Sequence, residues 1–471
     1  MWKTFLLING HRLIFHVIIE LLKISNFFRK SDALYLLAFF LVLIALGTAL
    51  LALPGAANRD LGLMDALFTA VSAACVTGMG IVSLDTFSRF GQMIILLLIQ
   101  IGGLGIISFT SILLSIPGHR LAIRQRNSIL NFSINGIEYN PRRIVGNILL
   151  LTLCFEAAGA ALLSLTFYRS GIDDWAFWGI FHTVTAFCNA GLSPFAYGQT
   201  GVPPGSMPGF LAGRPSILII LMILTIAGGL GFIVLQDALQ VMLRKKTRLS
   251  YHSQVVLTMS AALVFGGALI FFIFEQNRLY GEMSGPLAAV NALFQSVVCR
   301  SSGFEAMPQG LLSQPSRMLT GFLMLTGGAP GSIAGGLKVT TIFVILFVMI
   351  RKPDKYGDIK IFHHRLTANT INRAVVYTLK AAALLVICIT ALYITEGFSG
   401  NNAEAIIFEV FGAFSTSGIT LGLTPNLSVA GKLVVLAAMF AGRVGLIALA
   451  FPVIGHKSYD ITYPEGSVLL G

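Results

Sequence analysis

Eight long apolar stretches, almost free of charged residues, limit what this chain can fold into more than any other feature. They lie at residues 33–55, 90–117, 144–168, 215–235, 255–274, 318–350, 374–395 and 433–455. A helix of about 20 apolar residues crosses the ~30 Å hydrocarbon layer of a bilayer. Because unpaired backbone groups are costly in hydrocarbon, each stretch is predicted to be a membrane-spanning helix.

Composition excludes the other broad classes. Of 471 residues, 55% are hydrophobic and 11% are charged, whereas soluble domains carry about 25% charged residues. So few charges cannot cover a water-facing surface, and so many apolar residues do not remain disordered. The chain is therefore predicted to be an all-α integral membrane protein.

The positions of the 32 Lys and Arg residues predict the orientation of the chain. Of these, 21 fall in the N-terminal segment, the loops between pairs of spans and the C-terminal tail; seven fall on the opposite side and four within membrane segments. Cytoplasmic loops carry the excess of Lys and Arg, so both termini are expected in the cytoplasm. The net charge of +12 then reflects topology, and no nucleic-acid partner is expected. Residues 1–32 are predicted to form an amphipathic interfacial segment, and 456–471 a tail.

Four shorter apolar segments lie between paired spans, near residues 62–77, 175–190, 286–299 and 402–416. Each ends in a related sequence, AACVTGMG, AFCNAGLS, VCRSSGFE or AFSTSGIT, which we call the first glycine motif. The aligned glycines Gly78, Gly191, Gly303 and Gly418 are 113, 112 and 115 residues apart. A segment too short to cross, repeated at this period, predicts a re-entrant helix.

A second glycine motif follows in each copy. Gly102, Gly327 and Gly442 each lie 24 residues after their first glycine, whereas Gly228 lies 37 after because of a polar insertion near 198–214. The repeating unit is thus span, short re-entrant helix, glycine motif, span. The four predicted pore repeats are residues 33–117, 118–243, 244–350 and 351–455. All four repeats cross the membrane in the same in-out direction. This predicts eight transmembrane and four re-entrant helices in pseudo-fourfold symmetry about one pore.

The first glycine motifs are the candidate selectivity filter. A short helix brings about half a negative charge at its C-terminus to the axis, and glycine permits the positive φ that turns carbonyls inward. A ring of such carbonyls can replace the water shell of a monovalent cation. For one glycine, helix packing is an equally good explanation, but four in register favour the filter. The candidate residues are Val76, Thr77, Gly78, Asn189, Ala190, Gly191, Ser301, Ser302, Gly303, Thr416, Ser417 and Gly418.

The second glycine motifs favour close helix contact, except in the third repeat. Residues 327–336 contain five Gly and one Pro and cannot form a regular helix. The sixth span is therefore predicted to break into a loop, 327–337, that acts as a gate. The candidate gate residues are Gly327, Gly328, Pro330, Gly331, Ser332, Gly335, Gly336, Lys338 and Arg443.

Cations inside the membrane are costly and need partners. Arg443 is expected to contact loop carbonyls or an acidic neighbour, and Lys338 either to serve the gate or to extend toward the cytoplasm. Arg300 is expected to buttress the filter backbone or to shape the field at the outer mouth, with simple packing as the alternative. Glu156 lies in the middle of the third span and could be a partner of the functional residues, but a structural role is favoured.

Together, CVTGMG, FGQMIILLLIQIGGLGI, FCNAGLS, RSSGF, GGAPGSIAGGLKVTT, STSGITLGLTPNLS and AGRVGLI resemble the Trk/Ktr/HKT superfamily of potassium transporters. The closest resemblance is to the membrane (pore) subunit of bacterial Ktr systems. It implies K⁺ uptake through a channel-like pore in the cell membrane, with Na⁺ as a coupling or activating ion. It also implies a homodimer on a cytosolic nucleotide-binding regulatory ring. The sequence departs from the family pattern at SIAGG and at STSG.

Two other functions compete. A secondary active cation or solute symporter with a mid-membrane site would normally need a coupling carboxylate or inverted repeats, and neither is evident. An intramembrane enzyme is not expected, because only His182 of the eight His lies in the membrane body, without an HExxH pair or a nucleophile beside a base. No cofactor is expected in this chain, and K⁺ is expected as the substrate, bound at the filter residues.

Overall fold

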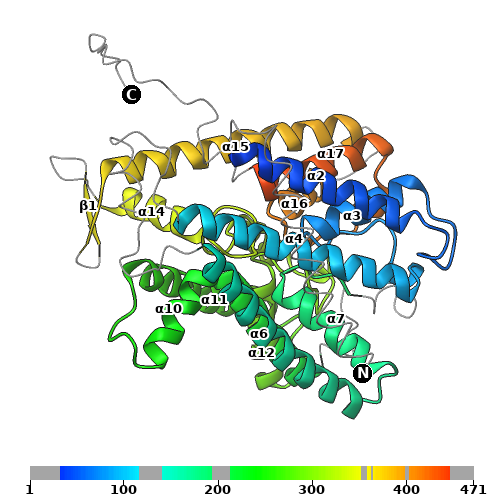
Figure 1. Cartoon of the computed structure of the whole chain (residues 1–471), viewed down its shortest axis with the longest axis horizontal. Coiled ribbons are helices and arrows are strands. Elements are labelled where there is room, and N and C mark those ends of the chain that lie inside the picture. The colour runs from blue at the N-terminus through cyan, green and yellow to red at the C-terminus, as the bar shows by residue number, and fades with distance from the viewer. Residues whose placement is uncertain are drawn as a thin grey trace, which may run out of the picture.

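A computed structural model describes residues 32–115, 141–193, 213–351, 358–361, 364–397 and 403–445. The chain is predominantly helical, as predicted (Figure 1). The predicted amphipathic segment before residue 32, the tail 456–471, the end of the last span and nearly all of the polar insertion lie outside the described residues.

The described helices follow the order of the predicted segments. They are α2 Asp32–Leu51, α3 Leu63–Ala74, α4 Arg89–Ser115, α6 Pro141–Arg169, α7 Trp175–Phe187, α9 Pro215–Leu230, α10 Phe232–Met242, α11 Tyr251–Glu275, α12 Gly285–Val298, α13 Gln314–Leu325, α14 Val339–Ile350, α15 Ala368–Glu396, α16 Ala403–Phe414 and α17 Val429–Phe440. A π-helical turn, Ala441–Gly445, continues α17. An antiparallel hairpin of β1 Ile359–Ile361 and β2 His364–Leu366 pairs Lys360 with Arg365.

Four described helices, α4, α6, α11 and α15, are long and apolar enough to cross a membrane, and the bent pair α9–α10 gives a fifth. Only 22% to 28% of the apolar windows of α6, α11 and α15 is buried within the chain, against 56% for α4. Apolar side chains this exposed need hydrocarbon rather than water around them. The chain is accordingly a multi-pass membrane protein.

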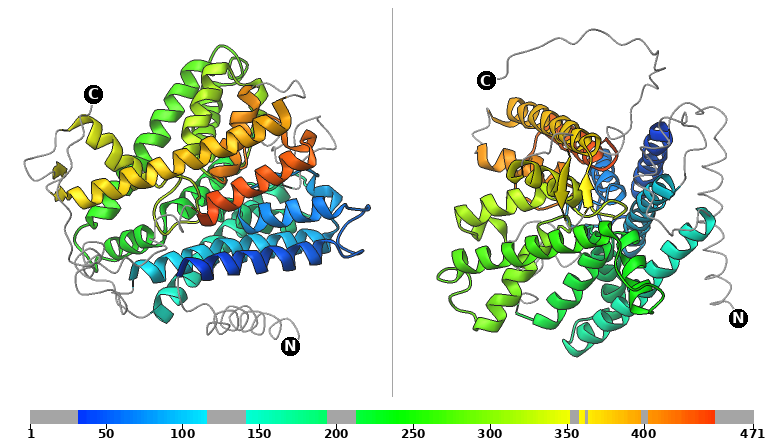
Figure 2. Two further views of the ribbon diagram at one scale, coloured as in Figure 1. Left: turned by 90° about the horizontal axis from the view of Figure 1, so that it is seen from above. Right: turned by 90° about the vertical axis from the view of Figure 1, so that its left-hand side faces the viewer.

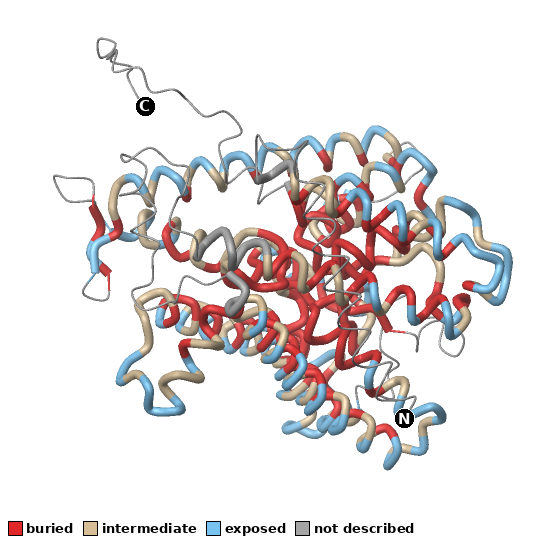
Figure 3. Tube along the Cα trace, viewed as in Figure 1, coloured by how far each residue is buried: buried red, intermediate tan, exposed pale blue. Residues whose placement is uncertain are grey.

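Buried residues concentrate in the centre of the molecule, where the short helices end (Figure 3). Long helices such as α15 and α6 lie at its outer edges (Figures 1 and 2). Each short helix contributes one almost completely buried phenylalanine to the core: Phe68, Phe181, Phe294 or Phe408. These aromatic side chains pack the short helices against the spans around them.

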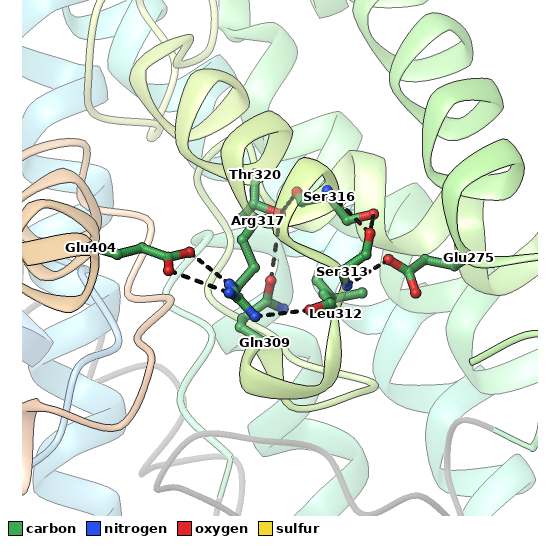
Figure 4. A network of polar contacts seen from close by, with 8 residues as sticks. All are labelled: Glu275, Gln309, Leu312, Ser313, Ser316, Arg317, Thr320 and Glu404. Atoms are coloured by element: carbon green, nitrogen blue, oxygen red, sulfur yellow. Dashed lines mark hydrogen bonds and ion pairs between the residues drawn. The ribbon is translucent and has the colours of Figure 1, made fainter. Parts of the chain in front are cut away.

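Side-chain caps fix where the helices α13 and α17 begin. The hydroxyl of Ser313 accepts a hydrogen bond from the Ser316 amide at the start of α13, and Ser428 does the same for Gly431 at α17. The carboxylate of Glu275 at the end of α11 accepts from the Ser313 amide at 2.8 Å (Figure 4). This contact ties the end of one span to the start of the next across the third repeat.

The fourth span is not continuous, so its prediction as a single helix over 215–235 was wrong. α9 ends at Leu230, α10 begins at Phe232, and their axes differ by 105°. Gly231 at the break has φ +80°, a conformation that glycine adopts without a Cβ clash.

The sixth span is broken, as the five Gly and one Pro predicted. α13 ends at Leu325 and α14 begins at Val339. Between them, the Gly327 amide donates to the Leu337 carbonyl at 2.8 Å, and the Leu337 amide donates to the Leu325 carbonyl at 3.2 Å. These hydrogen bonds join the two ends of the loop, so residues 327–336 form a closed loop between the two helices.

Candidate functional site

The four first glycine motifs meet in a closed ring. A Cβ built on Gly78 would lie 2.3 Å from the Ala190 carbonyl oxygen, and one on Gly191 would lie 2.1 Å from that of Ser302. The same contact runs from Gly303 to the Ser417 carbonyl at 2.6 Å, and from Gly418 back to the Thr77 carbonyl at 2.2 Å. Each glycine thus faces the carbonyl that precedes the glycine of the next repeat. All twelve candidate filter residues belong to the segments that meet here.

All four ring glycines have positive φ, +98°, +61°, +74° and +75° in chain order. Any side chain would therefore be strained as well as clash with a neighbouring backbone. Separations near 2 Å leave no space for even a methyl group. The ring needs glycine at each position because the backbones touch.

Three of the short helices end in the same way. Val76, Asn189 and Thr416 have φ between 51° and 56°, and the next amide bonds back five residues, as from Thr77 to Ser72 at 2.8 Å. This is a Schellman closure with a non-glycine residue in the left-handed region. Such a conformation costs about 1–3 kcal/mol per residue and persists only where packing imposes it.

The third short helix ends differently. Ser302 bonds back four residues to Val298 at 3.0 Å, and Ser301 is absent from the residues with positive φ. Arg300 stands three residues before its glycine, where the other repeats have Cys75, Cys188 and Ser415. The third copy of the motif therefore departs from the other three, and it is also the copy with the long loop.

The second glycine motifs support the short helices from outside the ring, as predicted. Cβ atoms built on Gly102, Gly228 and Gly442 would lie 1.8 to 2.0 Å from the carbonyl oxygens of Ala74, Phe187 and Phe414. Each acceptor stands four residues before its ring glycine. In the third repeat, Gly327 instead approaches the Gly335 carbonyl at 1.8 Å, so the loop packs on itself.

The loop 327–336 is bonded to the break in the fourth span. The Ala329 amide donates to the Gly229 carbonyl at 2.9 Å, and the Ile333 amide donates to the Gly228 carbonyl at 3.3 Å. In return, the Phe232 amide donates to the Gly331 carbonyl at 3.2 Å. The two broken spans therefore satisfy each other's free backbone groups.

The loop also lies against the ring. A Cβ on Gly335 would be 2.1 Å from the Thr416 hydroxyl oxygen and 2.8 Å from the Ser415 carbonyl oxygen. Beside it is a cavity of about 10 Å³ lined by Ala334, Gly336, Lys338 and Arg443. That volume holds about one water molecule.

Three cations donate hydrogen bonds to this loop. Arg443, which is 2% exposed, donates to the Ile333 carbonyl, and its other terminal nitrogen donates to Gly102 at 3.4 Å. The predicted contact of Arg443 with loop carbonyls is confirmed. Lys338 donates to the Ala334 carbonyl at 2.6 Å, so its amine faces the loop.

Arg300 bonds to a loop carbonyl rather than to a carbonyl of a first glycine motif. Its guanidinium donates to the Gly327 carbonyl at 3.3 Å. Glu156 of α6 accepts from Gln100 of α4 at 3.0 Å, which supports the structural explanation for that residue. Within the ranges that the structure describes, no group of three or more His, Cys, Asp or Glu could hold a metal ion.

Sequence reasoning passed over the buried polar side chains of the short helices, including Gln295 and Glu409. A signal was present, because His182 and Glu409 both stand nine residues before their ring glycines. In the sequence, His182 stood out only as a possible catalytic or metal-binding residue. Its ring nitrogens lie 2.8 Å from the Trp178 carbonyl and 2.9 Å from the Ser193 hydroxyl.

Comparisons with known proteins agree on the kind of protein that this chain resembles. Residues 23–455 match the model of the TrkH family, described as cation transport protein. The potassium/sodium uptake protein NtpJ of Enterococcus hirae is 34% identical over 457 residues, covering 94% of this chain and 98% of that protein. The Ktr system potassium uptake protein B of Bacillus subtilis is 33% identical over 445 residues, covering 92% and 95%.

A solved structure shares the fold. The crystal structure of the potassium transporter TrkH from Vibrio parahaemolyticus superposes with a TM-score of 0.69 at 20% sequence identity. The match covers 89% of this chain and 84% of that one. At this identity the likeness concerns the fold alone.

Proposed function

The chain belongs to the TrkH family of cation transport proteins, and from this premise we propose that it takes up potassium through a channel-like pore. Membership of a potassium-uptake family of transport proteins means that it is not an enzyme. The first glycine motifs form the selectivity filter in this proposal. K⁺ is the transported substrate, and Na⁺ is the coupling or activating ion.

The closed ring of four glycines is the observation that carries this proposal. Each ring contact places a main-chain carbonyl beside the next repeat, and none of the twelve filter residues is charged. Four short helices add the negative ends of their dipoles at the same place. Uncharged oxygens near dipole ends suit a monovalent cation. A filter selective for divalent cations would need a ring of carboxylates instead.

The ring also supports the finer architecture of eight spans and four pore helices around one axis. The proposed repeats are 33–117, 118–243, 244–350 and 351–455. The first repeat contacts the second, the second the third, the third the fourth, and the fourth the first. Consecutive repeats are thus neighbours around one centre, as pseudo-fourfold symmetry requires.

Residues 327–337 serve as the gate in this proposal. The loop lies against Thr416, is held by Arg443 and Lys338, and borders a cavity of about one water. A hydrated potassium ion cannot pass such a space. Conduction would require the loop to move and these hydrogen bonds to break.

The proposed partners rest on the family resemblance and on a relative's name, and the proposed orientation rests on the charge pattern. One relative is named as part of a Ktr system, which supports a membrane component of a multi-subunit assembly. We infer a homodimer on a cytosolic nucleotide-binding ring, with both termini cytoplasmic in the cell membrane.

Flux measurements in proteoliposomes test the function. The purified chain should conduct K⁺ down its gradient, and Gly78→Ser should lower the ratio of K⁺ to Na⁺ flux because the added side chain meets the Ala190 carbonyl. Rates far above the roughly 10³ per second allowed by millisecond conformational cycles exclude alternating access. Slow, saturable flux tied to a proton gradient would instead establish the symporter.

A further inference from the structure

At one shared register, the second, third and fourth short helices carry a long or ring-bearing buried polar side chain, where the first carries Thr69. His182 and Glu409 stand nine residues before Gly191 and Gly418, and Gln295 stands eight before Gly303. The buried phenylalanines show the same one-residue offset in α12. Phe294 stands nine residues before its ring glycine, and the other three stand ten before theirs. All three polar side chains are at most 4% exposed. Burial of such groups is costly unless each finds a partner.

Each of them bonds to the segment that follows its ring glycine, which we call the limb. His182 pairs with the Ser193 hydroxyl at 2.9 Å, two residues after Gly191. The Gln295 amide donates to the Gln309 side chain at 2.9 Å, six residues after Gly303. Figure 4 shows Gln309 beside Thr320 of α13, which lies within 3.5 Å of it.

Glu409 makes both kinds of contact. Its carboxylate accepts from the Thr420 hydroxyl at 2.6 Å and from the Thr424 hydroxyl, two and six residues after Gly418. The Gly422 amide donates to the Thr420 hydroxyl oxygen at 3.0 Å, which directs the threonine proton to the carboxylate. A buried carboxylate is therefore bonded through both oxygens to one limb.

The limb and its helix are also in direct backbone contact. A Cβ on Gly412 of α16 would lie 2.3 Å from the Ile419 carbonyl oxygen, immediately after the ring glycine. Rotation of that peptide plane would change the separation between limb and helix. The Glu409 bonds resist such a change, because stretching them would leave a buried carboxylate without donors.

We propose that Glu409 is a positioning residue that holds the fourth limb and thereby fixes the carbonyl geometry on which K⁺ over Na⁺ discrimination depends; His182 and Gln295 have the equivalent role. This inference rests on the proposed function of the ring. In the first repeat, the two equivalent limb positions are Gly80 and Leu84, which carry no polar side chain. The contact from this register to the limb thus recurs in three of the four repeats.

A matched pair of variants separates the hydrogen bond from packing. Thr424→Val keeps the shape of the side chain and removes the hydroxyl, whereas Thr424→Ser keeps the hydroxyl and removes a methyl group. Loss of a bond to a charged group matters most when that group is buried, so Thr424→Val and Glu409→Gln should each lower the K⁺ to Na⁺ flux ratio roughly tenfold. Thr424→Ser should retain the wild-type ratio, and a packing role would reverse that order.

Controls make the result decisive. Thr69→Val changes the equivalent position of the first repeat, which lacks a polar limb partner, and should leave the flux ratio unchanged. Ser193→Ala tests the second anchor with a small change if the Glu409 and Thr424 variants do not fold. Size-exclusion profiles and thermal unfolding report folding separately from selectivity.

The outcomes distinguish this inference from the proposed function. An unchanged ratio in folded Thr424→Val, Glu409→Gln and Ser193→Ala, with a lowered ratio in Gly78→Ser, overturns the anchoring role and keeps the filter. An unchanged ratio in Gly78→Ser removes the filter itself and the inference with it. A lowered ratio in the anchor variants, with Thr424→Ser like wild type, supports both.

Discussion

The ring glycines differ from most glycines of the chain in what surrounds them. Gly418 has φ +75°, and an added Cβ would lie 2.2 Å from the Thr77 carbonyl oxygen. Gly266, in the middle of α11, has nothing within 4 Å of that point. The sequence could single out Gly418 only through its register with three other glycines, each at the end of a short apolar segment.

Alanine at these two positions should therefore have opposite consequences. We expect Gly418→Ala to lower the K⁺ to Na⁺ flux ratio, as Gly78→Ser does, because the added methyl group forces two ring backbones apart. Gly266→Ala should retain flux and stabilise the helix by about 0.5–1 kcal/mol. Proteoliposome flux and thermal unfolding measure the two effects, and a wild-type K⁺ to Na⁺ flux ratio in Gly418→Ala would contradict the ring contact.

For Arg443, the sequence predicted a contact with the loop. It did not predict that the same guanidinium also bonds to α4. Its guanidinium donates to Ile333 in the loop and to Gly102 in α4. A planar group with several donors can join two carbonyls in this way, which a lysine cannot reproduce. The sequence placed a cation in the membrane, but the spacing to Gly102, far away in the chain, depends on tertiary structure.

Replacing Arg443 with Gln should open the gate without altering selectivity. Bonds from a charged donor contribute about 1.5–3 kcal/mol, and each 1.4 kcal/mol is a factor of about ten in an equilibrium. We expect K⁺ flux to rise about tenfold while the K⁺ to Na⁺ ratio stays constant. If Arg443→Gln instead yields no folded protein, the arginine is structural.

Two identical four-residue sequences show how far the ends of helices could be predicted from local sequence. GGLG occurs at 102–105 and at 228–231; α4 continues through the first, while α9 ends at the second. Local sequence cannot distinguish them, because the break at Gly231 is stabilised by amides and carbonyls of the loop in another repeat. The break in the sixth span was predictable because its cause, five Gly and one Pro, is local.

The break in the fourth span should control the loop. A Cβ on Gly231 would lie 3.0 Å from the Pro330 carbonyl oxygen, and its φ of +80° disfavours any side chain. Gly231→Ala is expected to displace the loop and raise K⁺ flux severalfold at unchanged selectivity. Gly229→Ala is the matched control, because its Cβ would meet only Asn189 at 3.6 Å and its carbonyl bond would remain.

Single-channel recording distinguishes the two variants most directly. Gly231→Ala should increase the open probability and leave the unitary current as in wild type. Equal open probability in Gly231→Ala, Gly229→Ala and wild type would show that the α9–α10 bend and the loop are not coupled.

At the scale of the whole molecule, the repeat period predicted which segments are equivalent and the structure adds how they touch. The regular separations of the ring glycines implied four units, and the closed order of ring contacts agrees with them. The different end of the third short helix could not be foreseen, because Arg300 bonds to a loop that lies elsewhere in the chain. The homodimer and the regulatory ring stay predictions from resemblance.

Ion pairs join neighbouring repeats at two corresponding places. Arg89, at the start of α4, pairs with Asp174 just before α7, and its guanidinium lies 4.2 Å from the ring of Phe177. Arg317 in the first turn of α13 pairs with Glu404 of α16 at 2.7 Å (Figure 4). In both cases the second span of one repeat holds the short helix of the next.

A charge exchange across the Arg317–Glu404 pair should test this order of repeats. Both side chains are partly exposed, 22% and 32%, so the pair contributes at most about 1 kcal/mol to stability. Arg317→Glu alone places two carboxylates together and should lower the unfolding temperature, as should Glu404→Arg. The double exchange should restore most of that loss, since the attraction is re-formed in reverse. Additive losses in the double variant would mean that the third and fourth repeats do not meet at this point, and the pseudo-fourfold arrangement would then need another order.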